Sequence, residues 1–555
     1  MFETENYKKD TSLEQCIEKW KSCSEEVTRI YKAQQEKLQK MLVEMPRLKN
    51  RFVEDYSLES MGINRYEVEL RRAPVGDNRM FSMPSHGTVI IVGDRSEAVI
   101  SAVRAKGYIP VTIGPEEDYE EMKRFFDKSF AGVISIADSS CNEDEGLDFV
   151  KRVFFAAKHT ANTWFEKKVV PFFVAVTKLG GTFGIDGTAP EYVTGSVSGI
   201  CKSAKREWAD RVSVHYIDVY PEISYSDLFD LIWKEVEYGD IVETGYAEDK
   251  QRRILALNER YEKRIDDENL PDENDVFLCA GGGEGVTSEC IMELGKRFHS
   301  KFIIFGMNKI DDGFIDPYPG INHEEMAVKI AAKSAAKGKR ITPSEADRAS
   351  RAIVSQRQLR KTVSTLKKYG CQVDYYQCDV TEKSDLKKII ERSEKRMGPV
   401  TGIVHGAGVL HDCLLNKKEE TGFDKVFGVK YSGIRNMLEL IDISRLKYML
   451  LYSSIAGFFG NFGQSDYSCG NEYLNHLARY YNNTLPTCKV MSMNWGPWNG
   501  GMVDHVLKNA MIRRGKNLIE LDEGKMFFVD AFAKKWNKSD CQLIINDENE
   551  LGGDF

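Results

Sequence analysis

Apolar strands and amphipathic helices alternate along most of this chain, from residue 87 to about residue 220 and again from about residue 276. In the first stretch GTVIIVGD is a predicted strand, SEAVISAVRAKGY a helix and IPVTIG a strand, and EEMKRFFDKSF is a further predicted helix. Such alternation predicts a parallel sheet covered by helices on both faces. Because the pattern stops and restarts, the sequence predicts an α/β protein with two Rossmann-like, doubly wound subdomains.

A polar segment, EDKQRRILALNERYEKRIDDENLPDENDV, separates the two patterns. At 555 residues the chain has room for several domains. We expect a helical N-terminal segment with a linker at 1–60, a structural subdomain at 61–265 and a catalytic subdomain at 270–555. The first subdomain has GDRSEA after its opening strand instead of a glycine-rich phosphate loop, so we expect it to serve structure or partner docking.

Residues 11–45 contain no proline or glycine and are helical in composition. Their apolar residues recur at alternating spacings of three and four, as in a short coiled coil: Leu13, Cys16, Trp20, Cys23, Val27 and Ile30. This seam is compatible with a homodimer helix and with a helix that packs on its own chain.

Charge and composition exclude several classes of protein. A net charge of -8 argues against a nucleic-acid or membrane-surface binder. No apolar run approaches the roughly 20 residues that span a bilayer, and the first residues lack the apolar core of a signal peptide. The 12 cysteines form no Cys-x-x-Cys pair, so we expect no metal site, no disulfide framework and a cytoplasmic location.

The second α/β pattern opens with a candidate cofactor site. VFLCAGGGEGVTSECIMELGKRF reads as a strand, a glycine-rich turn and a helix, the arrangement that brings backbone amides to a pyrophosphate. The next strand, KFIIFG, ends in Met307, Asn308 and Lys309, with no acidic residue for a ribose diol, which favours a phosphorylated cofactor. The candidate residues in the turn are Gly281, Gly282, Gly283, Gly285 and Val286.

Two later strands end at the same predicted edge. CQVDYYQCDV ends in Asp379 and Val380, a candidate clamp on the adenine, and GIVHGAG ends in Gly406, Ala407 and Gly408, which bring bare backbone near a ligand. Between the second and third strands, residues 310–365 form an insertion with a long charged helix. This helix is either solvated or part of the mouth of the site.

The stretch SSIAGFFGNFGQSDYSCGN, residues 453–471, carries the chemistry. Ser453 and Ser454 end the predicted strand KYMLLYSS, and Tyr467 opens a helix with Asn471 four residues on. Residues four apart share a helix face, so the phenol and the amide point to one volume. A hydroxyl, a phenol and an amide at the end of a strand indicate carbonyl chemistry.

These segments, together with GVLHDCLLNKKEETGFDKVFGVKYSGIRNMLEL and NWGPWNGGMV, resemble the ketoreductase domains of polyketide and polyunsaturated fatty-acid synthases. That family is a branch of the short-chain dehydrogenase/reductase superfamily. The resemblance spans residues 87 to about 545 and is strongest from 400 to 500. The family's serine, tyrosine, asparagine and lysine fall on Ser454, Tyr467, Asn471 and Lys430, with lysine and asparagine exchanged relative to most of the superfamily, as in synthase ketoreductases.

The resemblance implies a β-ketoacyl reductase that works with NADPH on an acyl chain held by an acyl carrier protein, beside other synthase components. Lys430 would lower the pKa of Tyr467, Ser454 would hold the substrate oxygen, and Asn471 would order the lysine and a water molecule. Ser453 is the alternative active hydroxyl, but its spacing to Tyr467 fits the family motif less well. Two further hypotheses stay open, an inactive reductase-like scaffold and a free-standing dehydrogenase of small ketones.

The cofactor segments depart from the family pattern. The family usually has threonine at Ala280 and often arginine at Glu284 and Met307, so Lys309 is the remaining basic group for a 2'-phosphate. We expect NADPH, with NADH as the alternative. By resemblance, Asn494 and Gly496 also contact the cofactor.

The resemblance also bears on stereochemistry. Asp412 stands where members that form the D-alcohol carry aspartate, and Phe459 where members that form the L-alcohol carry tryptophan. These residues and Gln464 predict a D-type product.

Overall fold

The structure is a computed structural model that describes residues 63–126, 130–138, 141–164, 171–258, 269–500, 516–533 and 541–547, with Lys508, Met511 and Arg513 as isolated positions. All of these residues belong to one compact unit. The predicted helix at 11–45 lies outside the described residues. No helix in the described ranges has both the length and the apolar character that crossing a membrane requires.

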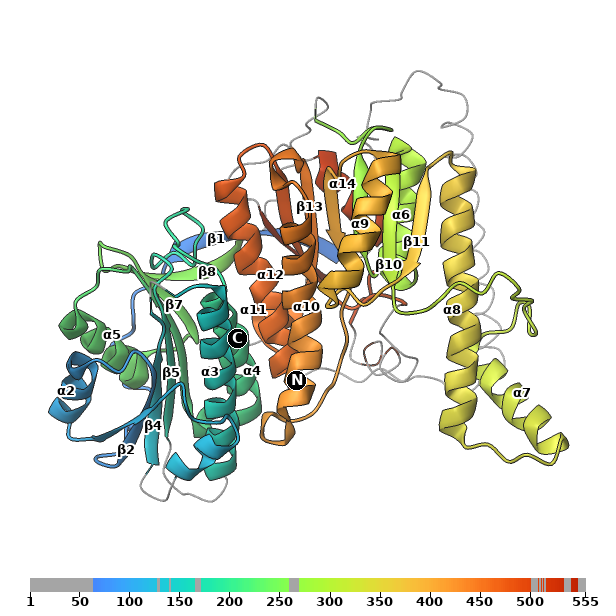
Figure 1. The fold of residues 1–555 in the computed structure, drawn as a ribbon. Coiled ribbons are helices and arrows are strands. Elements are labelled where there is room, and N and C mark those ends of the chain that lie inside the picture. The colour runs from blue at the N-terminus through green and yellow to red at the C-terminus, as the bar shows by residue number, and fades with distance from the viewer. Residues whose placement is uncertain are drawn as a thin grey trace, which may run out of the picture. The chain divides into compact units, whose positions relative to one another are not determined.

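The C-terminal half contains seven parallel strands (Figure 1). In sheet order they are β11 (Val373–Gln377), β10 (Lys301–Gly306), β9 (Val276–Ala280), β12 (Gly402–His405), β13 (Tyr448–Ser454), β14 (Lys489–Trp495) and β15 (Gln542–Asp547). From β9 the chain adds β10 and β11 on one side, and then returns to place β12 on the other side of β9. The strand order therefore reverses between β9 and β12. In open α/β sheets, ligands bind at such a switch point, beside the carboxyl ends of the strands.

The structural half contributes six parallel strands to the same sheet. In sheet order they are β7 (Glu243–Tyr246), β6 (Ser213–Val219), β5 (Phe172–Thr177), β4 (Phe130–Ile136), β2 (Thr88–Gly93) and β3 (Ile109–Ile113). The α/β prediction is therefore confirmed for both halves.

Two strands with antiparallel neighbours join the two halves into one sheet of 15 strands. β1 (Ile63–Arg72) pairs with β15 and with β8 (Arg252–Asn258). β8 lies in the polar segment that we expected to be a break, so that expectation is wrong there. The strand was missed because charged residues flank its short apolar centre. Two residues of that centre, Leu255 and Leu257, pack against buried Tyr66 and Val68.

Twelve α-helices are described. They are α2 (Glu97–Ala105), α3 (Glu143–Trp164), α4 (Val197–Trp208), α5 (Tyr225–Tyr238), α6 (Gly285–Phe298), α7 (His323–Ala336), α8 (Pro343–Lys368), α9 (Lys383–Met397), α10 (Glu420–Leu440), α11 (Ile455–Phe459), α12 (Ser465–Thr484) and α14 (Leu521–Ala533). The predicted helix EEMKRFFDKSF is instead a short 3-10 helix, Glu121–Phe125, in which Met122 is the buried side chain. One buried position does not provide the apolar stripe that stabilises an α-helix.

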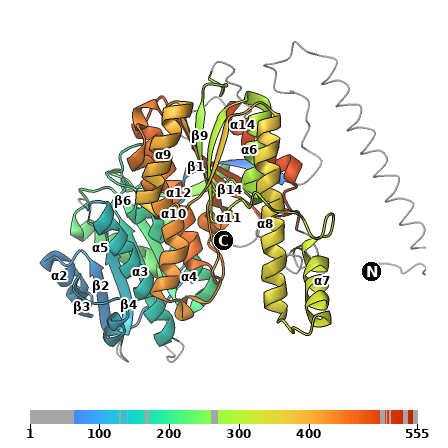
Figure 2. The same ribbon diagram turned by 45° about the vertical axis from the view of Figure 1, so that its right-hand side comes forward.

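The long helix predicted in the insertion is confirmed as α8, which packs against α7 (Figure 2). Its start is specified locally by Thr342, whose hydroxyl accepts a hydrogen bond from the Glu345 amide, while the Glu345 carboxylate accepts from the Thr342 amide. Pro343 occupies the first helical position, where a missing amide hydrogen costs little.

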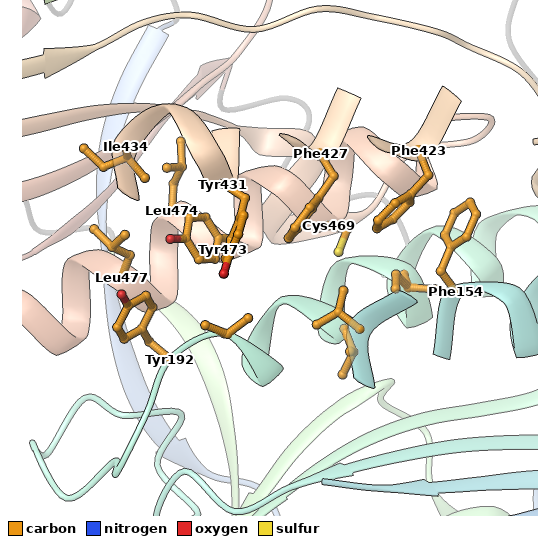
Figure 3. Packing of buried hydrophobic residues seen from close by; sticks show 14 of the residues in the cluster. Phe154, Tyr192, Phe423, Phe427, Tyr431, Ile434, Cys469, Tyr473, Leu474 and Leu477 are labelled. Carbon is orange, nitrogen blue, oxygen red and sulfur yellow. The ribbon is translucent and has the colours of Figure 1, made fainter. Parts of the chain in front are cut away.

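Aromatic side chains fill the contact between the two halves (Figure 3). Phe154 of α3 lies 4.4 Å from Phe423 of α10, and Tyr192 lies 5.9 Å from Tyr473 of α12, measured between ring centroids. Pairs of this kind contribute about 0.5–1.5 kcal/mol each beyond the area they bury. The structural half therefore packs directly on the helices that carry Lys430 and Tyr467.

Helices α4 and α12 approach closely at Gly199. A Cβ there would lie 2.5 Å from the carbonyl carbon of Ser468 and 2.7 Å from the amide nitrogen of Cys469. We expect Gly199→Ala to lower the free energy of unfolding by about 1–3 kcal/mol, because backbone cannot give way as a side chain can. Activity should fall as well, since α12 must shift.

The matched control is Gly428→Ala on α10, where a Cβ has no neighbour within 4 Å. It should be neutral or stabilising by up to about 1 kcal/mol, the gain in helix propensity. Urea denaturation checks both variants. Equal midpoints for Gly199→Ala and the unsubstituted protein would contradict the close packing.

Candidate active site

The glycine-rich turn between β9 and α6 packs against the loop after β12. Gly281 has a φ of +77°, and a Cβ there would lie 2.8 Å from the Ala407 amide nitrogen. The Gly406 amide donates to the Ala280 carbonyl at 2.9 Å. Both loops therefore expose backbone at the switch point of the sheet, where a dinucleotide fits.

Helix α8 of the insertion contacts this turn. The Thr362 hydroxyl donates to the Gly283 carbonyl at 3.0 Å, and the Gln358 side chain accepts from the Gly285 amide at 3.2 Å. Val286 lies in the first turn of α6, behind Gly285. Of the two alternatives for the inserted helix, the structure supports a place beside the site.

Residues after β10 and β11 lie at the same edge of the sheet. Met307 is 64% exposed, and the Asn308 side-chain amide donates to the Glu284 carboxylate at 2.6 Å. The side chain of Lys309 is exposed, and its carbonyl accepts from Gln356 at 2.6 Å.

After β11, one carboxylate oxygen of Asp379 accepts hydrogen bonds from the amide and hydroxyl of Thr381. Val380 is buried, and its carbonyl accepts from the Asn436 side chain. The adenine side of a dinucleotide would thus meet a carboxylate at Glu284 and a lysine at Lys309.

The four predicted catalytic residues come together. Ser454 ends β13, and Tyr467 lies in the first turn of α12 and is partly buried. The Asn471 side chain is buried and donates to the Tyr467 carbonyl at 2.8 Å, and its Oδ1 has no hydrogen-bond partner among the described residues. Lys430 comes from the facing helix α10, with Nζ 5.9 Å from the centroid of the Tyr467 ring.

Burial shifts the pKa values in this group. It raises the pKa of Tyr467, while hydrogen bonds with the side chains of Ser454 and Asn471 act in the opposite direction. Burial also lowers the pKa of Lys430 to about 7, and its Nζ donates to the Tyr452 carbonyl at 2.6 Å. The expectation that Lys430 lowers the pKa of Tyr467 is therefore wrong for this arrangement, in which burial dominates both groups.

The two adjacent serines face different surroundings. The Ser453 hydroxyl is buried and lies 3.1 Å from two acceptors, the Asn471 carbonyl and the Asn494 side-chain oxygen, and it can donate its one hydrogen to either. The Ser454 hydroxyl accepts from the Ala456 amide at 3.2 Å, at the start of α11, and also hydrogen-bonds the Tyr467 side chain. The structure thus brings Ser454, not Ser453, to the phenol.

Two residues predicted to contact the cofactor are engaged elsewhere. The Asn494 side chain is fully buried and exchanges hydrogen bonds with Asn475 of α12 at 3.0 Å. Gly496 packs against β15, where its amide donates to the Ile545 carbonyl at 2.7 Å. In this structure the Asn494 side chain links β14 to α12 by hydrogen bonds.

The predicted stereochemical residues lie in two loops. Gln464 donates to the Asp412 carboxylate at 2.8 Å, so the loop after β12 meets the loop before α12. The Phe459 ring packs against a buried cluster that contains Tyr66 and Phe458. Asp412 and Gln464 are therefore together, and Phe459 belongs to a neighbouring apolar cluster.

A buried ion pair at the start of α12 was not predicted. Lys418 Nζ lies 2.7 Å from the Asp466 carboxylate and also donates to the His411 carbonyl at 2.8 Å. The same Asp466 oxygen accepts from the Tyr467 amide at 2.8 Å. Lys418 and Asp466 are almost fully buried, so this pair fixes the backbone of Tyr467. In the sequence, the position of Asp466 directly before Tyr467 is the signal that could have indicated this ion pair.

Another buried charged cluster lies between the halves. Glu243, Glu472 and His476 offer atoms within 4.8 Å of one another. Lys202 Nζ lies 2.9 Å from Glu243 and 3.2 Å from Glu472, so an ammonium already compensates both carboxylates. We assign this cluster to packing between α4, β7 and α12.

Residues 323–500 match the family model of the KR domain. This part of the chain is similar to KR domains. The matched residues contain all four predicted catalytic residues, and KR domains are oxidoreductases that act on keto groups. The resemblance recognised in the sequence is confirmed.

Relatives and solved structures agree with the KR assignment. One component of the polyunsaturated fatty acid synthase of Thraustochytrium sp. is 29% identical over 82% of this chain and 18% of its own length. Polyketide synthase PksL of Bacillus subtilis is 27% identical over 34% of this chain and 4% of its own. This chain thus spans less than a fifth of the length of these relatives.

Among solved structures, an N-terminal ketoreductase from the macrolactin assembly line superposes with a TM-score of 0.68 at 16% identity. The alignment covers 92% of this chain and 98% of that one. A ketoreductase domain from the bacillaene assembly line superposes with a TM-score of 0.60 at 17% identity, over 88% and 99% of the two chains. These structures show that the KR fold extends over both halves of the chain.

Proposed function

We propose that this KR domain reduces the β-keto group of an acyl chain carried on the phosphopantetheine arm of an acyl carrier protein, with NADPH as hydride donor and a D-hydroxyacyl thioester as product. The observation that carries the proposal is the convergence of Ser454, Tyr467, Asn471 and Lys430 beside the carboxyl end of β13. The likeness to a polyunsaturated fatty-acid synthase and to polyketide synthases supports a substrate of this class.

The nicotinamide, when bound, supplies the hydride. Tyr467 donates its phenolic proton to the ketone oxygen as the carbon accepts that hydride. A raised pKa keeps the phenol protonated at neutral pH, so it is ready to act as the acid. Ser454 donates a second hydrogen bond to the same oxygen and stabilises the charge that develops there.

Lys430 and Asn471 restore the proton to Tyr467. A lysine with a pKa of about 7 exchanges protons readily near neutral pH, which suits a proton donor. The Asn471 side chain hydrogen-bonds the Tyr467 side chain, and its unpartnered Oδ1 would accept a hydrogen bond from a bridging water. In this proposal the proton passes from Lys430 to Tyr467 between turnovers.

The glycine-rich turn and the loop after β12 would form the dinucleotide site, and Gly281 allows their backbones to approach, since a Cβ there would lie 2.8 Å from the Ala407 amide nitrogen. The amides at the start of α6 would hold the pyrophosphate. Gly282, Gly283, Gly285, Val286, Asp379, Val380, Gly406 and Gly408 would line the same cofactor site, with Lys309 at the 2'-phosphate.

We expect Lys309→Ala to raise the KM for NADPH by about 10-fold and to leave the KM for NADH almost unchanged, since one exposed charge contact to phosphate is removed. The exposed Lys337, on the tip between α7 and α8, provides the control substitution Lys337→Ala. Steady-state kinetics with both cofactors measure the effect. Equal changes in the two KM values would contradict a role at the phosphate.

We further propose the organisation that the sequence predicts: a helical N-terminal segment and linker at 1–60, a structural subdomain at 61–265 and a catalytic subdomain at 270–555. The seam in the N-terminal segment fits either packing on its own chain or a homodimer. Other synthase components would supply and remove the carrier-bound substrate, and the chain would act in the cytoplasm.

The proposed function is tested by following NADPH and NADH consumption with a carrier-bound β-ketoacyl chain and with a free ketone of equal length. We expect turnover with NADPH, a higher kcat/KM for the carrier-bound substrate, and the D-alcohol on chiral analysis. No turnover with either cofactor would favour an inactive scaffold. Equal rates on free and carrier-bound ketones would favour a dehydrogenase of small ketones, and an L-alcohol would overturn the D-type assignment.

A further inference from the structure

Helix α4 of the structural half contacts the segment between α11 and α12 at several points. The Arg206 side chain donates to the Phe459 carbonyl at 2.9 Å, and the Ser203 hydroxyl accepts from the Asn461 amide at 3.2 Å. A Cβ at Gly460 would lie 2.5 Å from the carbonyl carbon of Lys202. Residues 459–461 therefore pack on α4, shortly before the helix that carries Tyr467.

Glu207, in the last turn of α4, connects this loop to a second one. One of its carboxylate oxygens accepts from the Gly463 amide at 3.1 Å, and the other accepts from the Leu415 amide at 2.8 Å. Leu415 follows the loop at 406–414, which extends from the end of β12 and contains Asp412. A single carboxylate thus bonds the backbones of both loops, and hydrogen bonds to an ionised acceptor are among the stronger ones in proteins.

The two loops that Glu207 contacts are also joined to each other by hydrogen bonds. The Cys413 amide donates to the Gly463 carbonyl at 3.1 Å, and Gln464 donates to Asp412 at 2.8 Å. Together with the Lys418–Asp466 ion pair, these contacts form a closed frame around the start of α12. Glu207 is the member of this frame that comes from the structural half.

We propose that Glu207 is a positioning residue that fixes the two loops beside Tyr467 and thereby selects which face of the substrate ketone is reduced. The inference rests on the proposed function, because it assigns a selectivity to that reaction. Hydride and proton come from fixed positions, so the orientation of the acyl chain between the loops decides the configuration of the alcohol. Without the Glu207 carboxylate, the two loops would move more freely and the acyl chain could bind in both orientations.

Two substitutions at this position remove the contacts in steps. Glu207→Gln keeps the size but replaces one acceptor oxygen by an NH₂ group, which cannot accept from a backbone amide. Glu207→Ala removes both acceptors. The matched controls are Glu237→Gln and Glu237→Ala, at a glutamate of the structural half that pairs with Arg79 on the surface.

We expect Glu207→Ala to lower the ratio of major to minor alcohol enantiomer roughly tenfold, a factor equivalent to about 1.4 kcal/mol, and to raise the KM for the thioester by a similar factor. Glu207→Gln should lie between this variant and the unsubstituted enzyme. The pH profile of kcat should stay unchanged, since Tyr467 and Lys430 are intact. Amide hydrogen exchange should accelerate at 413–415 and 461–463, and the Glu237 variants should show none of these changes.

An active enzyme whose enantiomeric ratio stays within about twofold of the unsubstituted value in both Glu207 variants would overturn the inference alone. If Glu207→Ala does not fold, Glu207→Gln carries the same test. An unsubstituted enzyme that reduces no β-ketoacyl thioester overturns the proposed function, and this role with it, so the two failures are distinguishable.

Discussion

Tyr467→Phe should lower kcat for ketone reduction by about 10²–10⁴-fold, the contribution typical of a positioned general acid. The substitution removes the proton donor and keeps the ring, so the packing of α12 and the position 5.9 Å from Lys430 are retained. The KM for the thioester should change little, because the phenol acts mainly as charge develops on the oxygen. Steady-state kinetics with a carrier-bound β-ketoacyl chain measure both constants.

Tyr473→Phe is the matched control on the same helix. Its hydroxyl is buried without a hydrogen-bond partner among the described residues, and its ring packs against Tyr431 and Phe427. Removing an unsatisfied buried hydroxyl should be neutral or stabilising by about 1–3 kcal/mol and should leave kcat unchanged. Equal losses in the two variants would mean that Tyr467 acts through packing and not as the acid.

Lys430→Met should lower kcat by about 100-fold or more, since the proton donor to Tyr467 is lost. The same substitution should raise the stability of the protein at pH 6. Burial lowers the pKa of Lys430 to about 7, so keeping its ammonium in the folded protein costs free energy. Methionine fills the same buried space without that cost.

The pH dependence of this stability difference has a definite sign. Below about pH 7 the lysine is protonated in both the folded and the unfolded chain, and the full cost of the buried charge is present. Between about pH 7 and the unfolded value near 10.4 the unfolded chain binds more protons, so the stability of the lysine protein rises with pH. The advantage of Lys430→Met should therefore shrink across this range.

Lys418→Met provides the contrast. Lys418 is equally buried but is paired with Asp466 at 2.7 Å, so its loss leaves an uncompensated carboxylate. Breaking a buried pair in this way costs about 3–5 kcal/mol. Denaturant midpoints from pH 6 to 10 measure both variants. A Lys430→Met protein that is less stable than the unsubstituted one at pH 6 would contradict a desolvated lysine.

The local parts of the fold and of the site could be predicted from the sequence. The periodicity of apolar residues identifies most of the alternating strands and helices directly. The glycine cluster between β9 and α6 likewise indicates a turn. Tyr467 and Asn471 lie four apart on one helix, and Ser454 ends a strand, so their convergence follows from short-range geometry. Lys430 required the family motif, because nothing in its own helix distinguishes it from a solvated lysine.

The frame around Tyr467 could not be predicted, because its contacts join distant parts of the chain. Glu207 is separated from Leu415 by 208 residues and from Gly463 by 256. Both partners are backbone amides, which carry no side-chain signature in the sequence. Lys418 and Asp466 do have complementary charges, but many such pairs exist in a chain with 77 basic and 85 acidic residues.

The errors have physical causes as well. Strand β8 was concealed because polar flanks surround a short apolar centre that pairs with β1. The pKa of Tyr467 was expected to fall because sequence indicates which charges are near but not how deeply each group is buried. The cofactor contact of Asn494 stays a prediction from the family motif, and the sequence did not indicate that its side chain bonds Asn475 and Ser453 inside the protein.

Transfer of deuterium from NADPH that carries deuterium at both C4 positions to a carrier-bound β-ketoacyl chain tests the central claim most directly. Mass spectrometry of the acyl product should show a single deuterium at the β-carbon with the unsubstituted enzyme and with Tyr473→Phe, and almost none with Tyr467→Phe in the same time. A hydroxyacyl product without deuterium, or equal labelling with Tyr467→Phe, would contradict the assignment of this chain as a ketoreductase that acts through Tyr467.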